Sequence, residues 1–259
     1  MKKRHLAIAV AVILSATACN SSTDTAASSE AVTTPPETST SAEATTTSAA
    51  PTTTTTAAAS SACAELKGTV GDANLCTVHS ETPNYTIDMK FPVDYPDQDA
   101  VADVLTNQRD KFIEVVEEQP VRDVPKALDI KSTTYRSGDP ASGTESLAFE
   151  EYINFGGAHP VTNYEALNYD LGKKAPITFD TLFKPGAVPV LDSLVAAELE
   201  KALPGVDVGD NPISAEMYKN FALTDDAVLF FISQGQWTLS AAGPQTVSIP
   251  RAELASILN

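Results

Sequence analysis

The spacing of hydrophobic residues changes several times along the chain, and each change predicts a different element. Tyr85–Phe91 alternates apolar and polar residues, which predicts a half-buried strand. Apolar residues then recur every three or four positions, behind Asp97 or Asp99 as a helix cap and as far as Pro120. This second pattern predicts an amphipathic helix of about five turns.

A predicted β-hairpin follows this helix. Strands are expected at residues 127–135, 146–155 and 161–169. The last two are joined by Gly156-Gly-Ala-His-Pro160, and so short a connection with a glycine pair indicates antiparallel pairing.

The C-terminal part of the chain mixes helical and strand patterns. A strand end passing into a helical turn is predicted at 176–183, helices at 188–203 and 214–220, a buried central strand at 227–232, a last strand at 246–249 and a short helix from Pro250. Helices interspersed with mostly antiparallel strands predict a single α+β domain with two main helices.

Residues 1–18 have the features of a signal peptide. Lys2–Arg4 form a positive segment, Leu6–Leu14 is apolar, and small residues precede Cys19. The segment Ser15–Cys19 resembles a bacterial lipobox, with alanine where leucine usually stands three residues before the cysteine. The same small residues also satisfy the rule for ordinary signal peptidase, which would release a secreted protein.

The number of cysteines favours a lipid anchor over free secretion. Cys63 and Cys76 flank turn-forming residues in an exported chain, which indicates a disulfide-closed loop. If they pair, Cys19 has no partner, and attachment of a lipid such as palmitate explains its presence. Outside Leu6–Leu14 no apolar run approaches the roughly 20 residues needed to cross a bilayer.

Composition separates a tether from a folded part and excludes some functions. Residues 19–61 are rich in Thr, Ser, Ala and Pro without Lys or Arg, which predicts a disordered tether, either O-glycosylated or plain. Residues 62–259 must therefore form the core. The formal net charge of −17 argues strongly against nucleic-acid binding, and three cysteines exclude a cysteine-rich metal site.

Enzymatic signals are weak in this sequence. It has no G-x-S-x-G motif, and downstream of the signal peptide its histidines are His79 and His159. Their spacing does not suggest a zinc site, so we expect no metal and no cofactor. Glu150 and Glu151 are adjacent on a predicted strand and point to opposite faces, so they cannot form an acid–base pair with each other.

His159 is the residue with the sharpest functional signal. Gly156 and Gly157 allow unusual backbone conformations, and a proline stiffens the exit, so the imidazole is expected at a rigid hairpin tip. One interpretation is that His159 only holds the turn; the other makes Gly156, Gly157, His159 and Tyr164 contact a partner. We expect Trp237 to anchor the core rather than a binding surface.

A series of short motifs resembles the mycobacterial secreted immunogenic protein family. The motifs are Cys63-Ala-Glu-Leu-Lys-Gly68, Tyr95-Pro-Asp-Gln98, Arg109-Asp-Lys-Phe112, Gly156-Gly-Ala-His-Pro160, Pro176-Ile-Thr-Phe-Asp-Thr-Leu-Phe183, Tyr218-Lys-Asn-Phe-Ala-Leu-Thr-Asp-Asp226, Ala241-Ala-Gly-Pro244 and Ile249-Pro-Arg251. More distantly the chain is similar to the RsiV-type extracellular domain of lysozyme-sensing anti-sigma factors. The resemblance implies an exported α+β domain with the disulfide at Cys63 and Cys76 and no established enzymatic chemistry.

Two functions are compatible with these observations. The first is a monomeric, non-enzymatic binding domain, anchored by lipid to the outer face of the cell membrane or partly secreted. Its partner would be a basic protein such as lysozyme, or a cell-wall component, because negative charge accelerates encounter with cations. The charge can also serve solubility alone. The second function is an envelope hydrolase acting on peptidoglycan or lipid through His159.

Overall fold

The computed structural model describes residues 61–118, 126–206 and 214–259. The expected signal peptide, Cys19, the tether as far as residue 60, and Pro120 lie outside these residues, whereas Ser61, the last residue of the predicted tether, begins a helix. Among the helices of the described residues, none is both long and apolar enough to span a bilayer.

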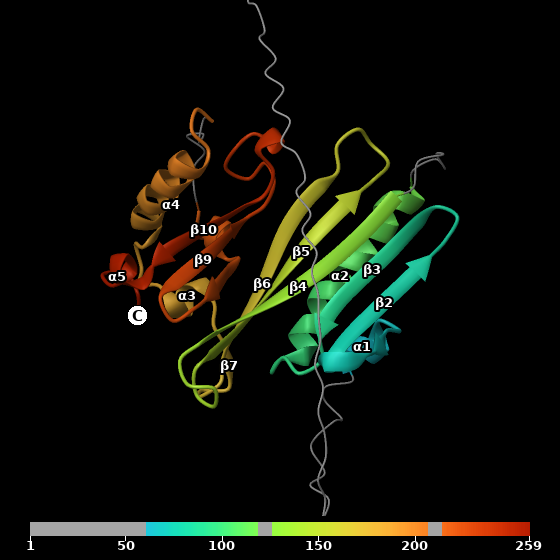
Figure 1. The fold of residues 1–259 in the computed structure, drawn as a ribbon, viewed down its shortest axis with the longest axis horizontal. Coiled ribbons are helices and arrows are strands. Elements are labelled where there is room, and N and C mark those ends of the chain that lie inside the picture. Colours follow the sequence, from blue (N-terminus) through green and yellow to red (C-terminus); the bar gives the residue numbers. More distant parts are fainter. Residues whose placement is uncertain (1–60, 119–125, 207–213) are drawn as a thin grey trace, which may run out of the picture. The chain divides into compact units, whose positions relative to one another are not determined.

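The described chain contains helices, 3-10 turns and strands, with four strands in succession in its middle (Figure 1). The helices are α1 (Ser61–Glu65), α2 (Gln98–Glu117), α3 (Phe179–Leu182), α4 (Val188–Ala202) and α5 (Arg251–Leu254), with 3-10 turns η1 (Asp72–Asn74), η2 (Ala215–Tyr218) and η3 (Ser240–Ala242). The strands are β1 (Thr69–Val70), β2 (Leu75–Glu81), β3 (Tyr85–Pro92), β4 (Lys126–Ser137), β5 (Thr144–Asn154), β6 (Val161–Asp170), β7 (Ala175–Pro176), β8 (Phe221–Leu223), β9 (Ala227–Ile232) and β10 (Gln245–Pro250). The predicted α+β class with two main helices, α2 and α4, is confirmed.

The strands form two sheets. The larger has seven strands in sequence order, β1 to β7, and the smaller has the order β10-β9-β8. Neighbouring strands are antiparallel except β3 and β4, which are parallel. Helix α2 connects that pair, because parallel strands need a crossover rather than a tight turn.

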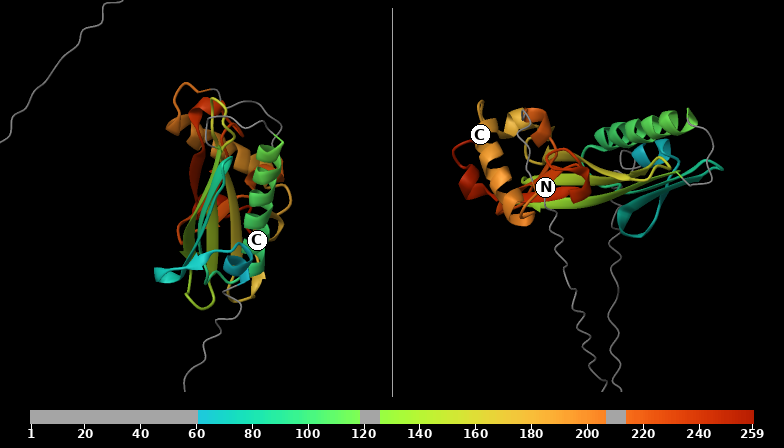
Figure 2. Two further views of the ribbon diagram at one scale, coloured as in Figure 1. Left: turned by 90° about the vertical axis from the view of Figure 1, so that its right-hand side faces the viewer. Right: turned by 90° about the horizontal axis from the view of Figure 1, so that it is seen from above.

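Helix α2 begins where the sequence predicted and covers one face of the large sheet (Figure 2). The carboxylate of Asp97 accepts a hydrogen bond from the backbone N–H of Ala100 at 3.1 Å, which caps the first turn. Val101, Leu105 and Phe112 are buried against the sheet. The three- and four-residue spacing thus identified the helix face that forms the first core.

The predicted disulfide between Cys63 and Cys76 is present and ties α1 to β2. Gly68 packs so closely against it that a Cβ atom there would overlap the sulfur of Cys76. Strand β2 itself was not predicted from sequence. Of its residues only Cys76 and Val78 are buried, so its apolar alternation is too short to detect.

A second core lies under the small sheet. Helices α4 and α5 pack on it, and Leu191, Val195 and Leu199 of α4 are buried. Strand β9 is the buried central strand that its continuous apolar run predicted. Trp237 is 4% exposed and packs against Tyr218 in this core, as expected.

Side chains of the C-terminal region complete the edge of the large sheet along β6. Because β6 pairs with β7 only at Tyr169 and Asp170, the rest of this edge has no strand partner. Hydrogen bonds replace that partner: the N–H of Thr162 donates to Gln234 Oε1, that of Tyr164 to Ser233 Oγ and that of Ala166 to Asn220 Oδ1, while Asn220 Nδ2 donates to the carbonyl of Tyr164. We call this line of contacts the seam. It satisfies backbone groups that would otherwise cost free energy and leave an open edge.

Candidate functional site

Glu151 is a buried carboxyl group in the middle of β5. It is 1% exposed, whereas its neighbour Glu150 is exposed, so the two point to opposite faces as predicted. Among the described residues, Glu151 Oε1 has no hydrogen-bond partner. A buried polar atom without a partner costs free energy, and such atoms deserve a functional explanation.

Glu151 lies in the wall of a cavity of about 330 Å³ beside the seam. We call it the Glu151 cavity. Its lining residues are almost all polar: Gln108, Glu151, Asn163, Tyr164, Glu165, Glu216, Lys219, Asn220, Ser233 and Gln236. They come from α2, β5, β6, η2 and the segments after η2 and β9, so the fold brings together parts of the chain that are distant in sequence.

The cavity shifts the titration of Glu151. Burial, with a smaller contribution from the negative charge of Glu165, raises its pKa to about 7, and the positive charges of Lys111 and Lys219 oppose this rise. Both Glu151 and Glu165 occupy odd positions on the paired strands β5 and β6, so they share one face of the sheet. A carboxyl group that is half ionised near neutral pH can bind a cation or exchange a proton.

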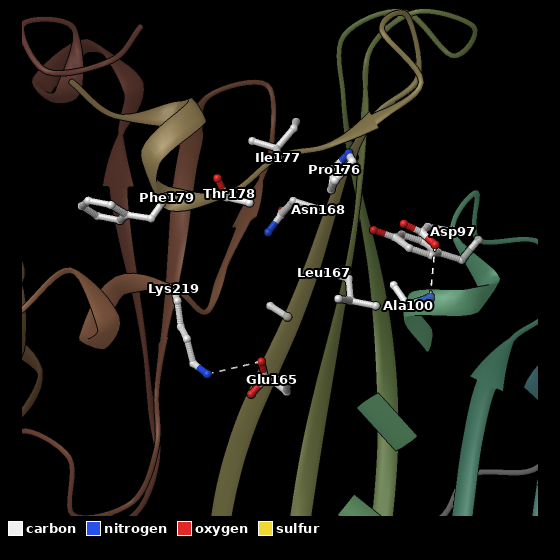
Figure 3. Close-up of a pocket in the computed structure, with 12 residues that line it drawn as sticks. Asp97, Ala100, Glu165, Leu167, Asn168, Pro176, Ile177, Thr178, Phe179 and Lys219 are labelled. Atoms are coloured by element: carbon white, nitrogen blue, oxygen red, sulfur yellow. Dashed lines mark hydrogen bonds and ion pairs between the residues drawn. The ribbon is translucent and has the colours of Figure 1, made fainter. Parts of the chain in front are cut away.

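A second cavity of about 200 Å³ adjoins the first and shares Glu165 and Lys219 with it (Figure 3). We call it the Asn168 cavity. Lys219 Nζ lies 3.6 Å from Glu165 Oε1, and this ion pair stands where the two cavities meet. Asn168 is buried, and its Oδ1 also lacks a hydrogen-bond partner within the described part of the chain.

His159 lies in a different cavity, near the tip of the β5–β6 hairpin. This cavity measures about 450 Å³ and is lined by His159, Pro160, Gln234, Ser240, Ala241 and Gly243. The imidazole is exposed, and a serine but no carboxylate is among these lining residues. The His159 cavity therefore has two of the three groups that a serine hydrolase of the triad type needs.

The other candidate residues of the hairpin do not line the His159 cavity. Gly156 has a positive φ of 76° and donates its N–H to Asn154 Oδ1, which supports the turn. Tyr164 is half-buried, packs against Phe231 and lines the Glu151 cavity instead. The structure thus places His159 and Tyr164 in different cavities, and Gly156 and Gly157 line neither of the two.

The remaining histidine, His79, is explained by a surface contact. Its Nδ1 lies 2.7 Å from Asp88 Oδ1 on the neighbouring strand, and the pair raises the pKa of His79. Within the described ranges, no cluster of three or more His, Cys, Asp or Glu side chains could hold a metal ion.

As one half of the adjacent pair Glu150–Glu151, Glu151 was predicted only to face away from its neighbour, and its place in a cavity was not predicted. A signal was available in the alternation of β5. Leu147, Phe149 and Glu151 occupy the same face, and the first two are core residues. A carboxylate at a position that the pattern reserves for the core is unusual and indicates a function.

Comparisons with known proteins relate the folded region to two named groups. Esterase Rv3036c of Mycobacterium tuberculosis is 41% identical over 198 residues, covering 74% of this chain and 87% of the relative. Immunogenic protein MPT64 of the same organism is 38% identical over 202 residues, covering 76% and 87%.

Two further matches cover smaller parts. A family described as protein of unknown function (DUF3298) matches residues 180–252. Peptidoglycan-N-acetylmuramic acid deacetylase PdaC of Bacillus subtilis is 30% identical over 128 residues, which span 46% of this chain but 27% of the deacetylase. The matched segment is therefore a minor part of that protein.

Proposed function

Because the chain belongs to the family of immunogenic protein MPT64 and esterase Rv3036c, we propose that it is a lipid-anchored envelope protein whose extracytoplasmic domain binds a basic protein partner. Family membership and the disulfide both fit an extracytoplasmic domain, since disulfides persist in oxidising compartments.

The observation that carries the binding function is the Glu151 cavity. A buried carboxylate oxygen without a partner among the described residues, in a cavity with two further glutamates, favours a ligand that brings positive charge and hydrogen-bond donors. The net charge of −17 acts in the same direction at long range, because it accelerates encounter with basic partners.

Surface plasmon resonance tests this function. The full-length protein is immobilised, and lysozyme, a strongly basic protein, is injected between 0.01 and 0.15 M salt, where the Debye length falls from about 30 Å to about 8 Å. We expect association to slow markedly as salt increases. No binding of lysozyme or of other basic envelope proteins at the lowest salt would leave the acidic surface as a device for solubility.

The lipid anchor has a separate test at Cys19. A Cys19→Ala variant cannot accept a lipid at this position, so we expect it to move from the membrane fraction to the culture medium. Cys63 and Cys76 are unchanged in this variant and keep the domain folded. Equal membrane retention of variant and wild type would contradict the anchor.

A second candidate function is ester hydrolysis in the His159 cavity. Two observations favour it: the relative named esterase is 41% identical, and Ser240 lines the same cavity as His159. Hydrolysis of a chromogenic short-chain ester should then be lost in both Ser240→Ala and His159→Ala, but not in Ser248→Ala, which changes an exposed serine of β10. Equal activity in all three variants and wild type would exclude this mechanism.

A further inference from the structure

The Glu151 cavity has more hydrogen-bond acceptors and negative charges than its own residues can neutralise. Glu151, Glu165 and Glu216 face a single cationic side chain among the lining residues, Lys219. The ion pair of Lys219 is with Glu165, so it neutralises one carboxylate and leaves Glu151 Oε1 without a hydrogen-bond partner among the residues that the structure describes. An anionic ligand would be repelled here, whereas a cationic ligand would be stabilised.

The position of Glu151 within a paired strand prevents its side chain from turning outward to form hydrogen bonds with bulk water. It lies within β5, which is hydrogen-bonded on both sides, to β4 and to β6. Its neighbours on the same face are the core residues Leu147 and Phe149. Hydrogen-bond donors for the Glu151 carboxyl group must therefore come from a group that enters the cavity.

Lys219 shows that the Glu151 cavity can hold a cationic side chain. Its ammonium lies 3.6 Å from Glu165, and its side chain is 51% exposed. A long side chain with this exposure can move aside at little cost, because an exposed ion pair contributes little free energy. The ammonium group of Lys219 therefore competes for Glu165 with any cation that enters the Glu151 cavity.

From these contacts we propose that the Glu151 cavity receives the ammonium or guanidinium group of a lysine or arginine side chain of the basic partner, with Glu151 and Glu165 as its carboxylate ligands. The inference rests on the proposed binding function and names the chemical group that the cavity takes and the residues that hold it.

The test compares adjacent glutamates on opposite faces of one strand. Binding of a tri-lysine peptide amide and of lysozyme to the full-length protein is measured for wild type, Glu151→Gln and Glu150→Gln. We expect the Glu151 variant to bind at least tenfold more weakly and the Glu150 variant to stay within twofold of wild type. Lys219→Gln should bind more tightly, by about twofold to fivefold, because the competitor is removed. An equal loss in both glutamate variants would overturn the cavity as the site and leave binding by long-range charge.

The pH dependence adds a readout that a structural role would not give. Glu151 faces Glu165, Glu216 and Lys219 across the cavity and Lys111 from α2, and burial raises the pKa of Glu151 to about 7. Since a cation binds the ionised form, wild-type affinity should rise about tenfold between pH 6 and pH 8. The rise should be absent in Glu151→Gln.

A direct measurement separates the failure of this site from the failure of the proposed function. The side-chain carboxyl resonance of Glu151 is followed by NMR while ethylammonium chloride is added, with sodium chloride as the control. A saturable shift with ethylammonium alone supports the site even if lysozyme does not bind. Identical behaviour in the two salts overturns it even if lysozyme binds elsewhere.

Discussion

The middle and the tip of the β5–β6 hairpin are built in opposite ways, although eight residues separate Glu151 from His159. In the middle, a carboxyl group is held rigidly by paired strands, is 1% exposed and has an oxygen without a partner. At the tip, an exposed imidazole sits on a glycine-containing turn. The middle holds an unpaired polar atom in a fixed position, as binding sites on rigid elements do. At the tip, by contrast, the polar groups can form hydrogen bonds with water.

The seam is what makes the middle of the hairpin rigid, and removing it should have the largest effect. Asn220→Ala deletes both hydrogen bonds to β6 and leaves the carbonyl of Tyr164 and the N–H of Ala166 without partners. At about 2 kcal/mol for each part-buried group that loses its partner, we expect the free energy of unfolding to fall by about 4 kcal/mol in chemical denaturation. Asn163→Ala is the matched control, since it leaves every seam bond in place. Equal losses in the two variants would mean that the seam does not support the hairpin.

The buried carboxyl group should make stability depend on pH. Its pKa of about 7 in the folded state lies above the ordinary value of 4.5, so the folded chain holds more protons in this window. Stability therefore falls as pH rises from about 4.5 to 7 and is constant above it, by the linkage relation. Glu151→Gln cannot ionise and should be more stable than wild type at pH 8, by up to about 3 kcal/mol.

The control for this prediction is the neighbouring acid on the opposite face. Glu150→Gln should follow the wild-type pH profile, because that carboxyl group is exposed. Thermal melts at pH 5 and pH 8 are sufficient to compare the three proteins. A Glu151 variant whose stability still falls between these pH values would show that another group causes the dependence.

The same contrast explains how much could be predicted from the sequence. Local patterns identified α2, α4, β9 and the β5–β6 hairpin, because each carries an apolar period long enough to detect. Strand β2 was not predicted because most of it is exposed. The parallel pairing of β3 with β4 was not predicted because it joins distant segments. The Glu151 cavity is assembled from α2, β5, β6 and residues after 214, and no local pattern contains that proximity.

The turn at the tip depends on the left-handed backbone conformation of Gly156, and its loss should lower stability less than the loss of the seam. Gly156 has a φ of 76°, in the left-handed region that costs other residues about 1–2 kcal/mol. We expect Gly156→Ala to lower stability by about 1 kcal/mol. Gly157→Ala should be nearly neutral, since a Cβ there meets no atom within 4 Å. A larger loss at Gly157 than at Gly156 would contradict this account of the turn.

Of the residues compared, His159 should contribute least to the stability of the fold and to binding of the partner. Its imidazole is exposed, so His159→Ala removes little buried surface and should change unfolding free energy by less than about 0.5 kcal/mol. Lysozyme binding should stay within twofold of wild type, because the proposed contact is at Glu151. Calorimetric unfolding and surface plasmon resonance on the same preparation measure both effects. If His159→Ala instead weakens binding as strongly as Glu151→Gln, the partner must contact the tip as well as the middle, and the functional contrast between the two regions would no longer hold.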